Sequence, residues 1–306
     1  MIYTLTISPS IDYINELKKF EINTINRSFL SYYNIGGKGI NVSLVLKNLN
    51  MPSYILGFKA DFTGDYLEQQ LNKLNIDNYL IKASGSTRVN VKVIGEKEFA
   101  INTDSLIIEE EHIDELIDKI KTIQDNDILI ISGSIPSNIN NNLYEKIIEN
   151  IHSKVKIVID AENELLMKTL KYNPFLIKPN REELGCIFGT TINTLNDAFE
   201  YAHKLRKLGA QNVIISLDKD GAILVDSDDK EYSLQNAKGK MISSVGAGDS
   251  LIAGFICGVE RNYSTKDSFI LGVACGNATA YSNSLADKSS IEKMVELLKE
   301  TNKCEY

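Results

Sequence analysis

Short apolar runs alternate with longer amphipathic segments along most of this 306-residue chain. The apolar runs predict strands at residues 53–58, 128–132, 155–160, 175–178 and 212–217. Helical periodicity occupies the intervals between them, at 65–74, 113–123, 143–151 and 196–208. Strands that alternate with helices predict an α/β fold, in which helices flank a mostly parallel sheet on both faces.

Two stretches interrupt this alternation. Residues from about 12 to 35 and from about 86 to 104 contain no segment with helical periodicity and are predicted to be extended. With 306 residues, of which 43% are hydrophobic and 24% charged, the chain is long enough to bury a large core. We therefore expect a single α/β domain over residues 1–306, with a small appendage.

A glycine-containing run, Ser-Val-Gly-Ala-Gly-Asp-Ser at 244–250, precedes an apolar helical pattern. Gly246, Ala247 and Gly248 have little side-chain bulk, so their backbone N–H groups can converge on an anion at the helix N-terminus. Asp249 stands directly beside this position. Its carboxylate can cap the helix, or it can take the proton from a hydroxyl that attacks a γ-phosphate.

A second glycine turn, Gly36-Gly37-Lys38-Gly39, leads into a helical pattern over 42–49. It is not a Walker A loop, because Gly39 stands where that motif has Ser or Thr and Tyr33 where it has glycine. Neither glycine run matches the dinucleotide-binding fingerprint. The turn is either an ordinary glycine-rich turn or a place where Lys38 and Asn41 contact a polyhydroxylated or phosphorylated ligand.

Polar residues follow several predicted strands at the point where each strand ends. Asp12 follows the first strand, residues 132–134 (Ser-Gly-Ser) follow the strand at 128–132, and Asp160 and Lys178 end two more. Open parallel sheets bind ligands beyond the carboxyl ends of their strands. These residues are therefore candidates for one shared site.

The charge balance limits the classes of partner. The chain has 33 Lys and Arg against 41 Asp and Glu, a formal net charge of −8, which argues against nucleic-acid binding because that affinity comes from clustered cations. Any cationic site must therefore be local. The sequence has neither a run of 18 apolar residues nor a basic leader before an apolar core, so we expect no membrane partner and a cytoplasmic location.

Together these motifs resemble the ribokinase-type, or PfkB, family of carbohydrate kinases, and the resemblance covers nearly all of the chain. The turn at 36–39 is similar to the amino-terminal signature of the family, and residues 245–250 are similar to its carboxy-terminal signature. The resemblance implies a ribokinase-like fold, in which the stretches at about 12–35 and 86–104 pair into a small β-sheet lid over the substrate site. It also implies ATP and Mg²⁺.

The resemblance also implies roles for individual residues. Asp249 would be the general base, and the amides that stabilise the transferring charge would be those of Gly246, Ala247 and Gly248. The substrate-binding residues would be Asp12, Gly37, Lys38, Asn41, Arg88, Ser134 and Arg27. The nucleotide-binding residues would be Lys178, Asn180, Ser216, Gly221, Gly248 and Asn277.

Some of these residues keep a second interpretation. Asn180 and Glu183 have the spacing that organises Mg²⁺ through water in this family, and also the spacing of a helix capping box. Asn277 either borders the purine or satisfies polar atoms inside a helix. Asp218 stands where the nucleotide loop of the family has glycine, which places both the backbone conformation and the charge of that loop in question.

A sugar that already carries phosphate needs cations, which Lys38, Arg88 and Arg27 can supply. Of these we favour Lys38 and Arg88, because Arg27 fits a solvated surface charge better. Within the family, segments 4–13, 35–42, 87–92 and 132–136 look most like those of enzymes that phosphorylate fructose 1-phosphate.

The resemblance thus implies ATP-dependent transfer to the 6-hydroxyl of fructose 1-phosphate, giving fructose 1,6-bisphosphate. The alternatives are a kinase for tagatose 6-phosphate or another sugar phosphate and, more distantly, a sensor that binds a sugar phosphate without transferring a phosphoryl group. Besides these small molecules, the expected partner is a second copy of the chain, because lids interlock in family dimers.

Overall fold

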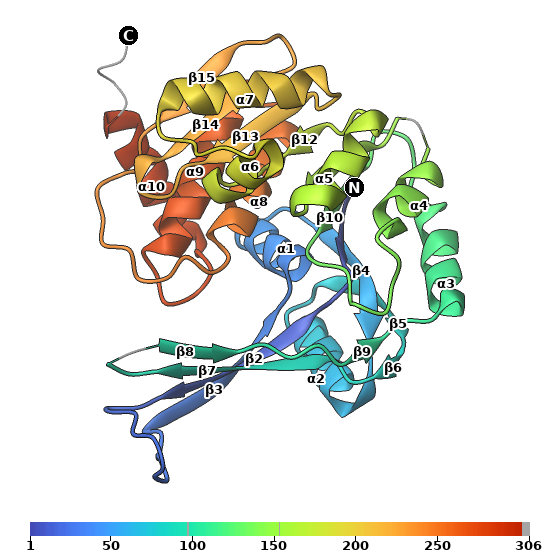
Figure 1. The fold of residues 1–306 in the computed structure, drawn as a ribbon, viewed down its shortest axis with the longest axis vertical. Coiled ribbons are helices and arrows are strands. Elements are labelled where there is room, and N and C mark those ends of the chain that lie inside the picture. Colours follow the sequence, from blue (N-terminus) through green and yellow to red (C-terminus); the bar gives the residue numbers. More distant parts are fainter. Residues whose placement is uncertain (97, 153, 302–306) are drawn as a thin grey trace.

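The computed structural model describes residues 1–96, 98–152 and 154–301. Its main sheet contains nine strands, β1 (Ile2–Thr6), β4 (Ser53–Lys59), β5 (Asp77–Lys82), β10 (Ile128–Ser132), β11 (Lys156–Asp160), β12 (Leu176–Ile177), β13 (Asn212–Ser216), β14 (Ala222–Val225) and β15 (Glu231–Leu234). Their order in space is β15-β14-β13-β12-β11-β10-β1-β4-β5 (Figure 1). The strands from β13 to β5 are parallel, whereas β14 and β15 pair in antiparallel fashion.

Helices cover both faces of this sheet. They are α1 (Lys38–Asn48), α2 (Asp61–Lys73), α3 (Glu110–Ile120), α4 (Leu143–Glu149), α5 (Asn163–Thr169), α6 (Arg181–Phe188), α7 (Leu195–Lys207), α8 (Ala247–Glu260), α9 (Thr265–Ala280) and α10 (Lys288–Thr301). One apolar core packs α3 to α7 against the sheet, and two others pack α1, α2 and α8 to α10 against the opposite face. Because both faces are covered, a strand such as β10 is buried at every position.

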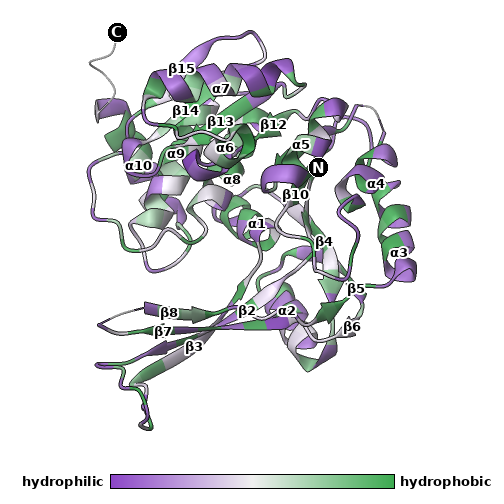
Figure 2. Cartoon of the chain, in the orientation of Figure 1, coloured by the Kyte–Doolittle hydropathy of each residue, from purple (hydrophilic) through white to green (hydrophobic). Residues whose placement is uncertain are grey.

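The fold class predicted from the alternation is confirmed. All five predicted strands are present, with ends that differ from the prediction by two residues or fewer, and the predicted helices occur as α1, α2, α3, α4 and α7. Figure 2 shows hydrophobic residues along the central strands and a mixture of hydrophobic and hydrophilic residues along α7. The structure adds the antiparallel edge of β14 and β15, which the alternation did not predict.

A separate four-stranded sheet is formed by the stretches that break the alternation. Its strands are β2 (Ser10–Glu16), β3 (Leu30–Gly36), β7 (Arg88–Ile94) and β8 (Glu98–Ile101), in the order β3-β2-β7-β8. Two short strands, β6 (Ser84–Gly85) and β9 (Leu106–Ile107), pair beside it. Because β2 follows β1 almost directly, the small sheet lies at the carboxyl ends of the main strands (Figure 1).

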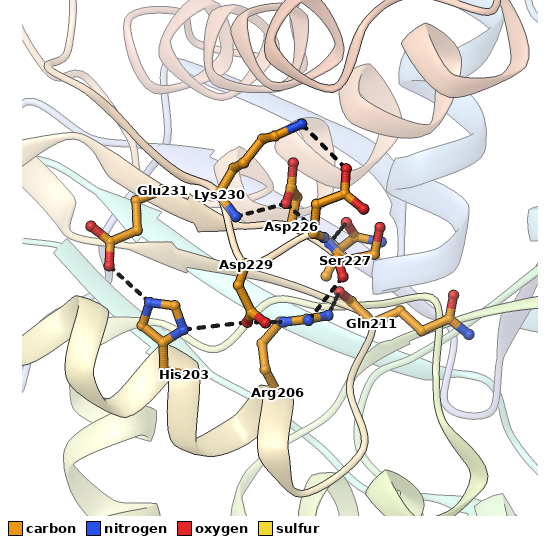
Figure 3. A network of polar contacts seen from close by, with 10 residues as sticks. His203, Arg206, Gln211, Asp226, Ser227, Asp229, Lys230 and Glu231 are labelled. Carbon is orange, nitrogen blue, oxygen red and sulfur yellow. Dashed lines mark hydrogen bonds and ion pairs between the residues drawn. The ribbon is translucent and has the colours of Figure 1, made fainter.

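A network of polar contacts joins α7 to the segment around β14 and β15, at the β15 edge of the main sheet (Figure 3). His203 of α7 lies 2.8 Å from the Glu231 carboxylate, and Arg206 of the same helix donates to Asp229 at 3.1 Å. Asp226, only 4% exposed, accepts hydrogen bonds from the turn that joins β14 to β15 and from Tyr232. None of these residues lines the large cleft described below.

Across the three described ranges, no helix is both long enough and apolar enough to cross a membrane.

Candidate active site

A cleft of about 2080 Å³ opens where the small sheet faces the carboxyl ends of the main strands. Its wall is formed by β2 and β7 of the small sheet, the N-termini of α1 and α8, and the loop that leads into α8. Pockets for one small molecule usually hold up to ~1,000 Å³. The cleft therefore has room for two substrates side by side.

Asp249 lies at the first turn of α8, beside the cleft. The N-cap of this helix is Gly246, with φ 77°, so the carboxylate of Asp249 does not occupy the cap position. Asp249 is only 6% exposed, and its carboxylate accepts a hydrogen bond from Asn41 Nδ2 at 2.8 Å. Burial, and next the charge of Asp160, raise the pKa of Asp249 to about 6. At neutral pH its carboxylate is ionised and able to accept a proton.

Two lysines from different elements both face the Asp160 carboxylate. Lys178, which directly follows β12, and Lys38, the first residue of α1, each place Nζ 3.4 Å from a carboxylate oxygen of Asp160. Burial alone would lower the pKa of Lys38, but the carboxylates of Asp160, Asp249 and Glu183 outweigh burial and raise it. The Lys38 ammonium is thereby kept charged, and both lysines line the cleft, where phosphate oxygens can reach them.

Glycine occupies two positions in this region where a side chain would crowd a neighbouring group. A Cβ on Gly248 would lie 2.9 Å from Lys178 Nζ, so the absent side chain leaves room for the ammonium against the helix N-terminus. Gly37, the N-cap of α1, has φ 118°, and a Cβ there would lie 2.7 Å from Thr6 Cγ2. Amides and ammonium together form an anion-binding surface at the N-termini of α1 and α8.

The wall formed by the small sheet carries a second group of charges. Asp12 of β2 accepts hydrogen bonds from Asn90 Nδ2 at 2.8 Å and from Lys92 Nζ at 2.6 Å, both on β7. Arg88, on the same strand, is half-buried, and its Nε is buried without a hydrogen-bond partner in the described residues. Burial lowers the pKa of Arg88, opposed by the charges of Asp104 and Asp12. Arg88 is thus the cation of this wall that an incoming anion can pair with directly.

Asn90 and Lys92 were missed by the sequence reasoning. They stand two and four residues after Arg88 on β7, so the period-two rule places all three on one face of the strand. All three line the cleft. The period-two spacing could have identified Asn90 and Lys92 from the sequence, provided that β7 had been placed in a small sheet facing the site.

Asn180 and Glu183 form a reciprocal capping box at the start of α6. The Asn180 side chain accepts from the backbone N–H of Glu183 at 2.8 Å, and the Glu183 carboxylate accepts from the backbone N–H of Asn180 at 2.8 Å. Both residues also line the cleft. The capping interpretation is therefore confirmed, and the same contacts hold one Glu183 oxygen in a fixed position at the site.

The segment after β13 also reaches the cleft. Ser216 and Gly221 line it, and Gly221, with φ 96°, has no space for a Cβ, which would lie 2.0 Å from the Leu234 carbonyl oxygen. Asp218 adopts the left-handed conformation, with φ 53°, and Asn236 Nδ2 donates to its carbonyl oxygen at 2.6 Å. The loop thus takes a glycine-like backbone conformation at Asp218 and keeps the added carboxylate at the edge of the cleft.

Asn277 lines the cleft from α9 and has both ends of its amide occupied. Its Oδ1 accepts from the backbone N–H of Ala237 at 2.9 Å, and its Nδ2 donates to Asn236 Oδ1 at 2.7 Å. The second interpretation of this residue, local satisfaction of polar atoms, therefore describes its contacts. Asn277 fixes the loop at 236–237 against the helix.

Two predicted substrate-binding residues lie apart from the others. Arg27 and Ser134 are both exposed, and neither belongs to the lining of the cleft. Arg27 lies in the segment between β2 and β3, and Ser134 follows β10. The other predicted residues, Asp12, Gly37, Lys38, Asn41, Arg88, Lys178, Asn180, Glu183, Ser216, Gly221, Gly246, Ala247, Gly248, Asp249 and Asn277, all line the cleft.

Comparison with known proteins agrees with this geometry. The model of the pfkB family of carbohydrate kinases matches residues 8–292. The chain is 38% identical to a 1-phosphofructokinase of Bacillus subtilis, over 98% of this chain and 99% of the relative. It is 32% identical to a D-tagatose-1-phosphate kinase of Bacillus licheniformis, over 96% and 97%.

A solved structure shows the same fold. Phosphofructokinase-2 from Escherichia coli in complex with fructose-6-phosphate is similar with a TM-score of 0.91 and 26% identity, over 97% of this chain and 99% of that one. The same enzyme has been solved in a tetrameric inhibited form. The match of the family model over most of the chain and the 38% identity across nearly its full length lead to one conclusion: this chain belongs to the pfkB family of carbohydrate kinases.

Proposed function

We propose that this protein transfers the γ-phosphoryl group of ATP to the 6-hydroxyl of fructose 1-phosphate, giving ADP and fructose 1,6-bisphosphate. One observation carries the chemistry: a buried carboxylate, Asp249, with a pKa of about 6, lies beside an anion-binding surface in a cleft with room for two substrates. The relatives named 1-phosphofructokinase and D-tagatose-1-phosphate kinase support a ketose 1-phosphate as the acceptor.

In the proposed mechanism, Asp249 takes the proton of the 6-hydroxyl as its oxygen attacks the γ-phosphorus. The bond between that phosphorus and the β–γ bridging oxygen breaks, and ADP leaves. The amides of Gly246, Ala247 and Gly248 and the Lys178 ammonium stabilise the charge on the transferring group. Asn41 holds the Asp249 carboxylate in place through its 2.8 Å hydrogen bond.

The sugar phosphate is proposed to bind at the wall formed by the small sheet. Arg88, with its unpartnered buried Nε, and Lys38 supply cations for the phosphate. Asp12 and Asn90 offer an acceptor and an amide to the sugar hydroxyls, and Lys92 neutralises Asp12 at 2.6 Å. A neutral sugar would leave the Arg88 guanidinium unpaired, which favours a phosphorylated acceptor.

ATP is proposed to lie along Ser216, Gly221 and the loop held by Asn277, with its phosphates toward Lys178. Glu183 and Asn180 suit Mg²⁺ held through water, because this ion keeps most of its waters and takes few protein ligands, and the capping box fixes the carboxylate. When bound, the ion neutralises phosphate charge.

The small sheet is proposed to act as a lid and as the surface that binds a second copy of the chain. It exposes large apolar side chains, with Phe29 62%, Ile101 64% and Tyr33 53% exposed. Such a group of side chains marks an association surface. In a homodimer it would be buried, and the exposed segment that carries Arg27 would lie near the interface. We propose that the protein is located in the cytoplasm, where ATP is available.

Release of ADP with Mg-ATP, followed with several acceptors at matched low concentration, tests the assignment. The acceptors are fructose 1-phosphate, tagatose 1-phosphate, fructose 6-phosphate, tagatose 6-phosphate and fructose. We expect the highest kcat/KM with fructose 1-phosphate. A preference for tagatose 1-phosphate or for a 6-phosphate would identify that sugar phosphate as the substrate instead. Binding of a sugar phosphate without ADP release would favour a sensor that transfers no phosphoryl group.

A further inference from the structure

One buried carboxylate contacts both Lys38 and Lys178 in the cleft. Asp160, the last residue of β11, is 3% exposed. Its Oδ2 lies 3.4 Å from Lys38 Nζ, and its Oδ1 lies 3.4 Å from Lys178 Nζ. Each oxygen thus faces a different ammonium, and the two ammonium groups come from elements far apart in the sequence.

The position of Asp160 follows from the main sheet. β11 pairs in parallel with β10, which places Asp160 beside Ser132, and β12 pairs on its other side just before Lys178. Residues at the ends of buried paired strands have little freedom to move. By contrast, Lys38 and Lys178 have long side chains, which lose rotamer freedom only when a partner holds them.

The charges explain why such a partner is needed. Lys178 is 6% exposed, and Lys38, whose side chain is 34% exposed, lies in the same cleft, so two like charges face one carboxylate. The Asp160 carboxylate lies between them in contact with both. Removing one member of such a buried group leaves the others uncompensated, which is far more costly than the loss of a surface ion pair.

We propose that Asp160 is a positioning residue for phosphoryl transfer: it holds Lys38 toward the phosphate of the sugar and Lys178 toward the phosphates of ATP, and it sets the charge around Asp249. This inference rests on the proposed kinase function. Asp160 contacts neither substrate in this scheme; it acts through the two lysines, and a single carboxylate couples both substrate subsites.

The charge around Asp249 gives the inference a direct readout. Asp160 from β11 raises the pKa of Asp249, whereas Asn41 and Lys38 from α1 and Lys178 after β12 lower it. Glu183 of α6 acts indirectly, because its charge raises the pKa of Lys38. Burial is the largest influence that raises the pKa of Asp249, and it remains if Asp160 becomes neutral, but the raising charge of Asp160 is lost while Asn41 and the two lysines still lower the pKa. The pKa of Asp249 then falls, and the acid limb of kcat/KM moves to lower pH.

The test compares wild type with Asp160→Asn, in steady-state kinetics with Mg-ATP and fructose 1-phosphate from pH 5 to pH 8. We expect the KM values of both substrates to rise by about tenfold and the acid limb to shift down by roughly one pH unit. The substrate phosphate titrates near pH 6 itself, but it does so equally with both proteins. The difference between their profiles therefore reports the enzyme.

Asp226→Asn is the matched control. Asp226 is buried to a similar extent, at 4% exposed, lies in the network of Figure 3 and does not line the cleft. It should keep wild-type KM values and the wild-type pH profile. Unchanged KM values and an unshifted acid limb in a folded Asp160→Asn protein would overturn the inference, as would a shift to higher pH.

A second variant covers the case in which Asp160→Asn does not fold. Asp160→Glu keeps the charge and moves it by one methylene, so we expect both KM values to rise while the acid limb stays in place. Wild-type KM values in Asp160→Glu would contradict the positioning role. Failure of the proposed function is separate from these outcomes, because it would appear as missing ADP release in the wild type itself.

Discussion

The two walls of the cleft are built in different ways. At the carboxyl ends of the main strands, Asp160 and Asp249 are nearly fully buried, and paired strands or a helix N-terminus fix their positions. On the small sheet, Arg88 and Lys92 are only partly buried, and neighbouring strands are exposed along much of their length. Proton transfer needs fixed groups, whereas substrate capture needs a wall that can approach and withdraw.

This contrast predicts that the two walls affect different kinetic properties. A change at Asp249 on the main-sheet wall should reduce turnover, and a change at Asp160 on the same wall should raise the KM of both substrates. Changes at the small-sheet wall should alter the affinity and choice of the sugar alone.

The largest effect is expected for Asp249→Asn. An amide cannot accept the proton of the sugar hydroxyl, and loss of a general base lowers kcat by roughly 10²–10⁴-fold. ATP affinity, measured by calorimetry, should change little. Turnover within a few-fold of wild type would show that another group is the base, and Asp226→Asn provides a folded control at a buried carboxylate outside the cleft.

Arg88→Ala should act on the other wall. Removing a charge-assisted phosphate contact costs about 1.5–3 kcal/mol, so the KM for fructose 1-phosphate should rise by roughly 10–100-fold while the KM for ATP stays near its wild-type value. Lys82→Ala, an exposed cation on β5 outside the cleft, is the control. An equal rise in both KM values would break the division between the walls.

The pH dependence of the wild type should follow Asp249. The group is active when deprotonated, and its pKa is raised to about 6, so kcat/KM should fall by about tenfold per pH unit below that value. Rates measured from pH 4.5 to pH 8 check this. A rate that stays level down to pH 5 would mean that Asp249 titrates near the ordinary aspartate value.

The smallest expected effect is on stability, and it has the opposite sign to the effect on activity. Because folding raises the pKa of Asp249, the folded state is favoured when the group is protonated, and this contribution is lost as pH rises from about 4 through about 6. At neutral pH the ionised group costs up to ~3 kcal/mol. Asp249→Asn should therefore melt at a higher temperature than wild type at pH 7.5, with a smaller difference at pH 4.5. A lower melting temperature at pH 7.5 would contradict the raised pKa.

The sequence is informative about the main sheet because apolar runs reflect burial on both faces. The strand ending at Ser132 and the polar residues that follow strands were predictable, since parallel pairing brings strand ends together. The antiparallel pairing of β14 with β13 was not, because short buried strands look alike whatever their direction.

Contacts between distant residues were the least predictable. The sequence placed Asp160 at a strand end, but pairing with both Lys38 and Lys178 depends on the position of α1 over the sheet. The same holds for Lys92, whose partner Asp12 is 80 residues away in the chain. In contrast, the capping box of Asn180 and Glu183 was predictable because both partners lie within one helical turn.

The most direct test of the division between the walls is the ratio of kcat/KM for fructose 1-phosphate to that for unphosphorylated fructose, measured in wild type, Asp249→Asn and Arg88→Ala. We expect a high ratio in wild type, a similar ratio at a much lower rate in Asp249→Asn, and a ratio reduced by at least about tenfold in Arg88→Ala. A ratio that collapses in Asp249→Asn and survives in Arg88→Ala would contradict it.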